Sequence, residues 1–293
     1  MPDPSPTAGT PDPDVKDGRP DWPDGVASLI SARVSFEREL PGWPKPGDPP
    51  VGPPRPAPPG RGGAQRIPRP YNARVGEPPP WADLPADRLR PTVAEVQAAL
   101  ATVGPALPSP RESLPQAGRP SAVLAPLYDD EDGLARVILT RRTWGLRTHQ
   151  GEVSFPGGRV DPGEDPQDAA RREAKEEIDL DPSMVELIGE LDHITTVSSQ
   201  SFIVPYVGAI AGGRPDTQPN PDEVDAVLHV TLAELLDPTY YREEIWTFPG
   251  GNERAFYFFE LKGDTVWGMT AALLRQLLGF VTGTRTRGQL GHP

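Results

Sequence analysis

Residues 157–180 read GGRVDPGEDPQDAARREAKEEIDL, a stretch that predicts a helix over residues 166–178. Pro166, the first residue of the predicted helix, suits the first turn of a helix. Glu173, Glu176 and Glu177 occupy positions i, i+3 and i+4, which lie on one helical face. Carboxylates this close repel one another, and a protein accepts that cost when a divalent cation lies between them. All-oxygen ligands suit Mg²⁺ or Mn²⁺, so the stretch indicates a cation site.

The alternative for the three glutamates is a solvated helix face, which the triplet taken alone favours. The surroundings reverse that balance. Gly158, Glu164 and the pair Arg172-Glu173 stand at fixed spacings, with five and then seven residues between them. A predicted short strand also ends in the tight turn Gly157-Gly158, whose carbonyl can face the cation. Chance agreement over so many fixed positions is remote.

This spacing resembles the Nudix box, whose family form is G-x5-E-x7-R-E-U-x-E-E-x-G-U, where U is a bulky apolar residue. The stretch departs from that form twice. Ala174 is small for the apolar slot, and Asp179 replaces the glycine near the helix C-terminus. A glycine there serves a left-handed cap, a conformation that Asp tolerates better than most residues. We therefore expect a modest local cost and retained metal binding.

The resemblance implies a role for each matching residue. The implied metal ligands are Glu173, Glu176, Glu177 and the carbonyl of Gly157. Arg172 and Glu164 would form an ion pair that orients the carboxylates. The implied reaction is attack of a metal-activated water on phosphorus in a nucleoside diphosphate linked to another group. The base would be Glu173 or the distant Glu223, although Glu223 alone has the pattern of an ordinary surface glutamate.

A second motif lies just upstream, where residues 139–158 read LTRRTWGLRTHQGEVSFPGG. It resembles the additional signature of coenzyme A diphosphatases within the Nudix superfamily. The residues assigned to substrate binding on this basis are Arg142, Arg147, Gly151 and Phe155. Coenzyme A carries a pyrophosphate and a 3′-phosphate, and two arginines could supply forked donors for them. The alternative for each arginine singly is a surface salt bridge.

The leading functional prediction is therefore a Mg²⁺- or Mn²⁺-dependent diphosphatase. The resemblance implies cleavage of coenzyme A or acyl-coenzyme A to 3′,5′-ADP and (acyl-)4′-phosphopantetheine. One alternative keeps the chemistry but changes the substrate to ADP-ribose or a dinucleotide. Another is a non-catalytic Nudix module that senses a ligand or acts as a scaffold. The three box glutamates are intact, which argues against the last alternative.

The rest of the chain predicts an α+β fold with helices packed on a mixed sheet, and the resemblance implies a Nudix-type α/β/α sandwich. Strands are expected over residues 121–128, 135–141, 151–155, 185–191, 202–210, 225–230, 245–248 and 255–261. Helices are expected over residues 92–103, 166–178 and 232–236, and from residue 264 or 265 to about 283. The Thr92–Glu95 capping box supports the first of these.

Proline divides the chain, because 22 of the 41 prolines fall in residues 1–80. Proline breaks helices and cannot donate in a sheet, so a disordered arm or linker is expected there. Within it, residues 26–40 lack proline and could form a short amphipathic helix. A transient helix in a disordered tail is the preferred interpretation, and a helix that docks on a protein partner is the alternative. We expect a transition segment with a short helix over 81–119, the hydrolase domain over 120–283 and a flexible tail over 284–293. Deleting residues 1–80 is then predicted to leave hydrolysis unchanged.

Charge and composition limit the partners. The net charge of −13 is concentrated after residue 85, where it amounts to −12. Such a domain repels a nucleic-acid backbone, so a small anionic substrate is expected rather than DNA or RNA. No apolar stretch predicts a membrane span, and no signal peptide is visible, so a cytoplasmic location is expected. The absence of cysteine and the scattered histidines argue against a zinc site.

Overall fold

The computed structural model describes residues 51–110, 112, 120–145, 149–195, 202–248 and 250–288, together with Pro44, Asp48 and Pro49. All of these belong to the compact unit Phe36–Pro293. The helix expected over residues 26–40 lies outside the described residues. Within the described part of the chain, no helix combines the length and the apolar character that a membrane span requires.

The larger sheet has the strand order β10-β4-β3-β9-β7. Its strands are β3 (Ser121–Asp129), β4 (Ala135–Arg142), β7 (Val185–Glu190), β9 (Phe202–Ile210) and β10 (Val224–Thr231). The strands β3 and β9 run parallel, whereas their other partners are antiparallel. The short strands β5 (Val153–Ser154), β6 (Gly157–Arg159) and β8 (Ile194–Thr195) pair with β4, β3 and β9. The prediction of a mixed sheet is confirmed, and β3 and β4 form an antiparallel hairpin.

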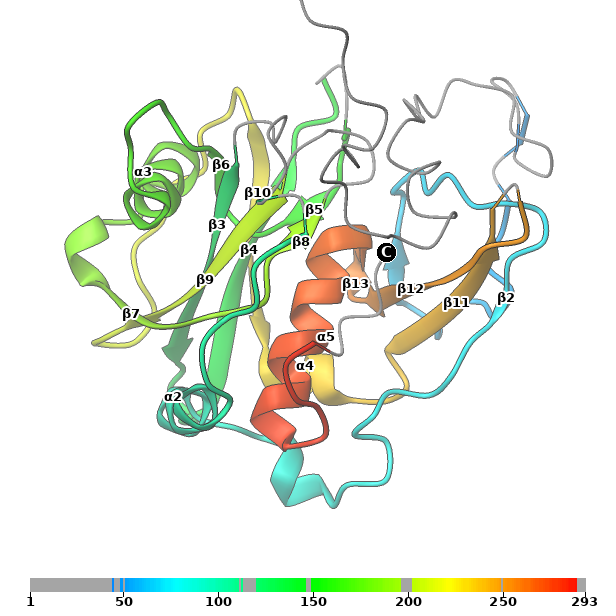
Figure 1. Cartoon of the computed structure of the whole chain (residues 1–293), viewed down its shortest axis with the longest axis horizontal. Coiled ribbons are helices and arrows are strands. Elements are labelled where there is room, and N and C mark those ends of the chain that lie inside the picture. Colours follow the sequence, from blue (N-terminus) through cyan, green and yellow to red (C-terminus); the bar gives the residue numbers. More distant parts are fainter. Residues whose placement is uncertain are drawn as a thin grey trace, which may run out of the picture. The chain divides into compact units, whose positions relative to one another are not determined.

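Helices cover both faces of this sheet (Figure 1). The helix α3 (Pro166–Ile178) packs on one face, where its alanines and Ile178 meet β3 and β9. The other face is covered by α2 (Val93–Thr102), α4 (Leu232–Leu236) and α5 (Gly268–Thr282). The capping box predicted for α2 is present, with Thr92 and Glu95 bonded reciprocally. Two short 3₁₀ turns, Ala86–Leu89 and Pro182–Met184, complete the helical elements of the described residues.

A second sheet lies on the far side of α5, with the order β14-β12-β11-β2 (Figure 1). Its strands are β2 (Arg74–Val75), β11 (Tyr241–Thr247), β12 (Glu253–Glu260) and β14 (Thr265–Trp267). The prediction that the last helix begins at 264 or 265 is wrong. Residues 265–267 pair with β12 as an edge strand, so α5 begins only at Gly268. It ends, as predicted, at a left-handed Gly283.

Residues 51–80 are part of this fold, so the prediction of a disordered arm up to residue 80 is wrong for this segment. The strand β1 (Gly62–Gly63) pairs with β13 (Lys262–Gly263), and β2 pairs with β11. Arg69 is only 4% exposed and lies 2.7 Å from Glu244, which is fully buried. Each proline removes only its own backbone N–H donor, so the residues between prolines can still form hydrogen bonds with the edges of the sheets.

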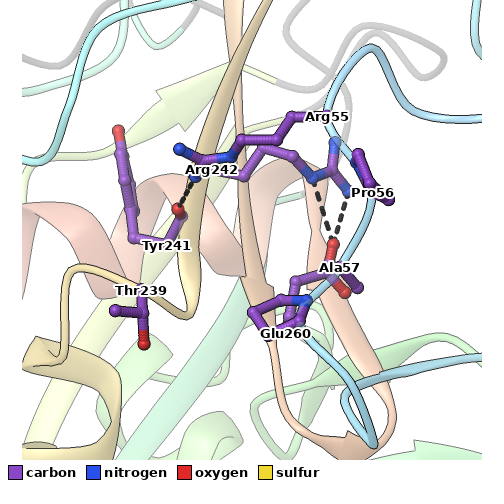
Figure 2. A pocket seen from close by; sticks show the side chains of 8 residues that line it. Arg55, Pro56, Ala57, Thr239, Tyr241, Arg242 and Glu260 are labelled. Atoms are coloured by element: carbon purple, nitrogen blue, oxygen red, sulfur yellow. Dashed lines mark hydrogen bonds and ion pairs between the residues drawn. The ribbon is translucent and has the colours of Figure 1, made fainter.

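The first part of this segment borders a pocket of about 280 Å³ on the second sheet (Figure 2). Arg55 donates to the carbonyl of Tyr241, and Arg242 donates twice to Glu260 (Figure 2). No predicted site residue is among the described residues that line this pocket. We therefore assign it to the docking of the segment and not to the predicted chemistry.

The chain after α5 is also anchored where it is described. Arg287 lies 2.9 Å from the carboxylate of Asp192 and also donates to the carbonyls of Gly104 and Glu190. The prediction of a flexible tail from residue 284 is therefore wrong for residues 284–288. Buried Asp192 needs a cationic partner, and the tail supplies it.

Candidate active site

The helix α3 presents the box glutamates, and its two ends fix its register. At the N-terminus, Asp165 accepts a hydrogen bond from the amide of Gln167, and Pro166 follows in the first turn. At the C-terminus, Asp179 is left-handed, with φ of 58°, and its side chain pairs with Lys175. The predicted left-handed cap is thus formed by Asp in place of glycine. Ala174 is 1% exposed, so the small side chain lets α3 approach the sheet closely.

Arg172 ties the loop before α3 to the helix. Its Nε and Nη2 lie 2.8 and 3.1 Å from the two carboxylate oxygens of Glu164. Nη2 also donates to the carbonyl of Arg159, at 3.1 Å. The hydrogen bonds from Arg172 lower the pKa of Glu164 to about 2. The ion pair expected from the sequence is present, and it closes the loop between β6 and α3.

Glu173 lies against the glycine turn. Its side chain is 17% exposed, and its carboxylate accepts from Arg172 Nη1 at 3.0 Å. A Cβ atom on Gly158 would lie 2.4–2.5 Å from the Glu173 carboxylate, so a side chain at this position would have to displace that carboxylate. Burial raises the pKa of Glu173, against the opposing effect of Arg172. The glycine therefore allows the Glu173 carboxylate to keep its present position.

A Gly158→Ala variant tests that packing. We expect the added methyl group to displace Glu173 and to lower hydrolysis by about 10- to 100-fold, because sub-ångström placement governs such sites. The melting temperature should change much less, since the glycine lies in a short strand at the sheet margin. Steady-state kinetics and thermal unfolding of the same preparations measure both quantities. Wild-type activity in this variant would show that the Glu173 position is unimportant.

Glu177 is the most deeply buried carboxylate of the helix, at 4% exposure. Burial raises its pKa to about 8, and neighbouring Glu173 and Glu223 add to the rise. Two groups oppose it: the Arg142 guanidinium, 4.0 Å away, and the N–H of Gly157. Its Oε2 atom is buried with no hydrogen-bond partner among the described residues. Such an oxygen is expensive to bury unless something binds it.

The sheet brings Glu223 to the helix from 46 residues further along the chain than Glu177. The strands β4 and β10 place Val224 opposite Arg142, and the Thr143 amide donates to the Glu223 carbonyl at 2.9 Å. The amide of Asn220 also donates to the Glu177 carbonyl at 2.8 Å. Arg142, Glu173, Glu177 and Glu223 therefore converge on one site, as far as the described residues show.

The remaining predicted site residues differ in exposure. The side chain of Glu176 is 57% exposed and pairs with Arg172 Nη1 at 3.2 Å, the same nitrogen that contacts Glu173. Phe155 is 2% exposed within the core, so its assignment to substrate binding is wrong: it is an apolar core side chain. Gly151, with φ of 65°, shapes the loop that carries the second motif, and Trp144 packs over it. Arg147 lies outside the described residues.

The fit of a cation to this site can be tested on the donor atoms. No three acidic or histidine side chains of the described residues form a ready-made metal cage. Arg172 accounts for this, because it engages Glu173 and Glu176. The unpartnered Oε2 of Glu177 nevertheless provides a hard oxygen donor beside Glu173, and such donors suit Mg²⁺ or Mn²⁺. The residues fit a divalent cation whose binding competes with Arg172.

Comparisons with known proteins bear on the family. The model of the NUDIX domain matches residues 118–249, which include every converging side chain described above. Nudix hydrolase 15, mitochondrial, of Arabidopsis thaliana is 38% identical over 161 residues, covering 53% of this chain and 55% of that protein. The uncharacterized Nudix hydrolase NudL of Photorhabdus laumondii is 33% identical over 172 residues, or 58% of this chain and 89% of that protein.

The chain belongs to the Nudix hydrolase family. It spans about half the length of the first relatives, which are plant proteins. The crystal structure of the Nudix hydrolase RenU from M. smegmatis is 24% identical over 39% of this chain and 70% of that chain, with a TM-score of 0.31. Residues 51–80, which complete the second sheet of this Nudix protein, lie outside the family match. Members of this family generally use divalent metal ions.

Proposed function

We propose that this Nudix domain hydrolyses the diphosphate of coenzyme A or acyl-coenzyme A with Mg²⁺ or Mn²⁺. The products would be 3′,5′-ADP and 4′-phosphopantetheine or its acyl form. The observation that carries the proposal is the pairing of Glu177 with Arg142 across 4.0 Å. Among the described residues, Glu177 is a buried carboxylate with one oxygen that has no hydrogen-bond partner, and Arg142 is a guanidinium whose Nε has none. A cation held by Glu177 and a phosphate bound to Arg142 would give each of these groups a partner of opposite charge.

The residues divide into two sets. Glu173 and Glu177 would hold the cation, with Glu176 and the Gly157 carbonyl as further proposed ligands. A bound divalent cation would neutralise phosphate charge and lower the pKa of a water molecule. Glu223 or Glu173 would accept the proton of the attacking water. The acidity of the domain is no obstacle, because the cation and Arg142 compensate for it locally.

The coenzyme A assignment rests on the upstream motif. That motif places Arg142 at the end of β4, and the structure directs its guanidinium to Glu177. An arginine 4.0 Å from Glu177 could donate two hydrogen bonds to the oxygens of one phosphate, while the neighbouring phosphate would bind the cation. The second motif and the box therefore contribute neighbouring side chains, Arg142 and Glu177, and this proximity supports a substrate in which phosphate groups are close together.

The test is direct. Purified protein is incubated with Mg²⁺ or Mn²⁺ and coenzyme A, and the products are separated by chromatography. We expect 3′,5′-ADP to form and to disappear when a chelator removes the cation. If no 3′,5′-ADP forms but ADP-ribose or a dinucleotide is cleaved, the substrate assignment is wrong and the diphosphatase chemistry stands. Binding without hydrolysis of any of these compounds would indicate a ligand-sensing module.

A further inference from the structure

One buried amide outside the family match joins three distant parts of the chain. Gln65 is 8% exposed and lies just after β1. Its Nε2 donates to the Gly151 carbonyl at 3.0 Å and to Asp264 Oδ1 at 2.7 Å. Its Oε1 accepts from the Thr265 amide at 2.9 Å. Both donors and the acceptor of this amide are thus used, as buried amides require.

The backbone around Gln65 is shaped for this position. Gly62 and Gly63 pair with Lys262 and Gly263 in parallel register. A Cβ atom on Gly63 would lie 2.1 Å from Gln65 Oε1 and 2.6 Å from the Asp264 Cα, so only glycine allows the approach. The Gly63 amide also donates to the Thr265 hydroxyl at 3.1 Å. This close docking delivers the amide of Gln65 to its three partners.

Asp264 connects Gln65 to β4, because its carboxylate also binds Arg141. Its Oδ2 accepts from Arg141 Nη1 at 2.9 Å, and Arg141 Nε donates to Asp225 at 2.9 Å. Successive residues of a strand point to opposite faces. Arg141 is therefore anchored on one face while Arg142 is directed from the other face toward Glu177. The orientation of the end of β4 depends on the pair that Gln65 completes.

Gln65 also contacts the end of the β4–β5 connection, just before β5. The Gly151 carbonyl accepts from Gln65, and the next residue, Glu152, accepts from the Arg142 amide at 2.9 Å. Gly151 further supports the ring of Trp144, since a Cβ atom there would lie 2.4 Å from that ring. The two ends of this connection are therefore bonded to each other through Arg142 and Glu152, and the end at Gly151 is also bonded to Gln65.

We infer that Gln65 is a positioning residue that fixes Gly151 and Glu152, at the described end of the β4–β5 connection, and with them Arg142, for the substrate. The inference rests on the proposed function only for its kinetic consequence. Its structural part is independent of that function: a segment outside the family match supplies the amide that holds Gly151, near Arg142 and Glu177. A role of this kind affects substrate binding more than the chemical step, because Gln65 touches neither Glu173 nor Glu177 among its hydrogen-bond partners.

Three variants of the full chain test it. Gln65→Met keeps the length and removes all three hydrogen bonds. Gln65→Glu keeps an acceptor for Thr265 but loses the donors to Gly151 and Asp264. Arg61→Met is the matched control, since it breaks the pairing of the same segment with Glu234 without touching the loop. Hydrogen exchange by mass spectrometry, on peptides that contain the amides of Arg142 and Glu152, reports the loop directly.

We expect faster exchange of these amides in both Gln65 variants. We also expect KM to rise about tenfold, which is the free-energy scale of one lost buried hydrogen bond, and kcat to change far less. Arg61→Met should leave exchange and KM at wild-type values. The inference is overturned if Gln65→Met matches Arg61→Met, or if Gln65→Glu matches wild type, which would mean that only the Thr265 contact matters. If the wild-type chain cleaves no diphosphate, the proposed function fails while the exchange data still decide the role of Gln65.

Discussion

A Glu177→Gln variant is expected to lose about 10²- to 10³-fold or more in hydrolysis, the scale on which lost electrostatic stabilisation is measured. Gln keeps the shape of the side chain and an oxygen for the Gly157 amide, but it removes the charge that would hold the cation. Its amide would also face the Arg142 guanidinium, 4.0 Å from the present carboxylate. Steady-state kinetics with Mg²⁺ and calorimetric titration with Mn²⁺ measure the loss of activity and of cation affinity.

The matched control is Asp168→Asn, on the same helix. Its side chain is 73% exposed and lies 3.9 Å from Arg171, away from the converging carboxylates. Such an exposed pair contributes little, so activity and cation affinity should stay at wild-type values. Undiminished activity in Glu177→Gln would remove this carboxylate from the proposed cation site.

The Glu177→Gln variant, without metal, should be more stable at neutral pH than the metal-free wild-type protein. The pKa of Glu177 is raised to about 8 in the folded state, from an ordinary value of 4.5. Between these two values the unfolded chain binds fewer protons than the folded one, so stability falls as pH rises. Below pH 4.5 both states are protonated and the penalty vanishes. Thermal unfolding in chelator from pH 5 to 8 should show a shallower decline for Glu177→Gln than for wild type.

Removing residues 1–80 is expected to lower the melting temperature by about 10 °C or more, in contrast to the sequence-based prediction of an unaffected hydrolase. The deletion takes Arg69 away from Glu244, which is fully buried, and strips β2 from β11. It also removes Gln65 from Gly151 and Asp264. Depriving a buried ion pair of one partner costs about 3–5 kcal/mol, a large share of the stability of a domain.

A chain that begins at residue 51 is the comparison for this deletion, because it retains every contact of the segment 51–80 described above. Its melting temperature and its kinetics should match those of the full chain. Circular dichroism on heating, with activity assayed below the transition, measures both. Equal melting temperatures for the chains that begin at residues 51 and 81 would contradict the role assigned to the segment.

The features predicted correctly from the sequence depend on neighbouring residues. The helix α3 was expected over its observed residues, with Pro166 in its first turn. The left-handed cap at Asp179 and the ion pair of Arg172 with Glu164 were expected from the resemblance to the Nudix box, and both are present. The strand β9 and the short helix α4 were also expected over their observed residues. In each case the pattern within a few turns or residues is enough to determine the structure.

The errors concern residues whose partners lie far along the chain. The strand β11 begins at Tyr241, four residues before the predicted start, because Arg242, Glu243 and Glu244 look like exposed loop residues. They are buried, and their charges are met by Glu260, Arg275 and Arg69 from other elements. A local sequence pattern does not predict such pairs, because a buried charge needs a partner and these partners are distant in the sequence.

The candidate site combines both kinds of information. Local spacing brings Glu173, Glu176 and Glu177 to one helical face, and the longer motif around them makes them candidate ligands. The sequence pattern cannot say that Glu176 turns outward to Arg172, nor that Arg142 and Glu223 reach Glu177. Those contacts depend on how β4 and β10 pair and on how closely α3 packs against β3 and β6, at Gly157 and Gly158. Burial and distance arise only when the chain closes on itself, and they govern which carboxylate is left with an unpartnered oxygen.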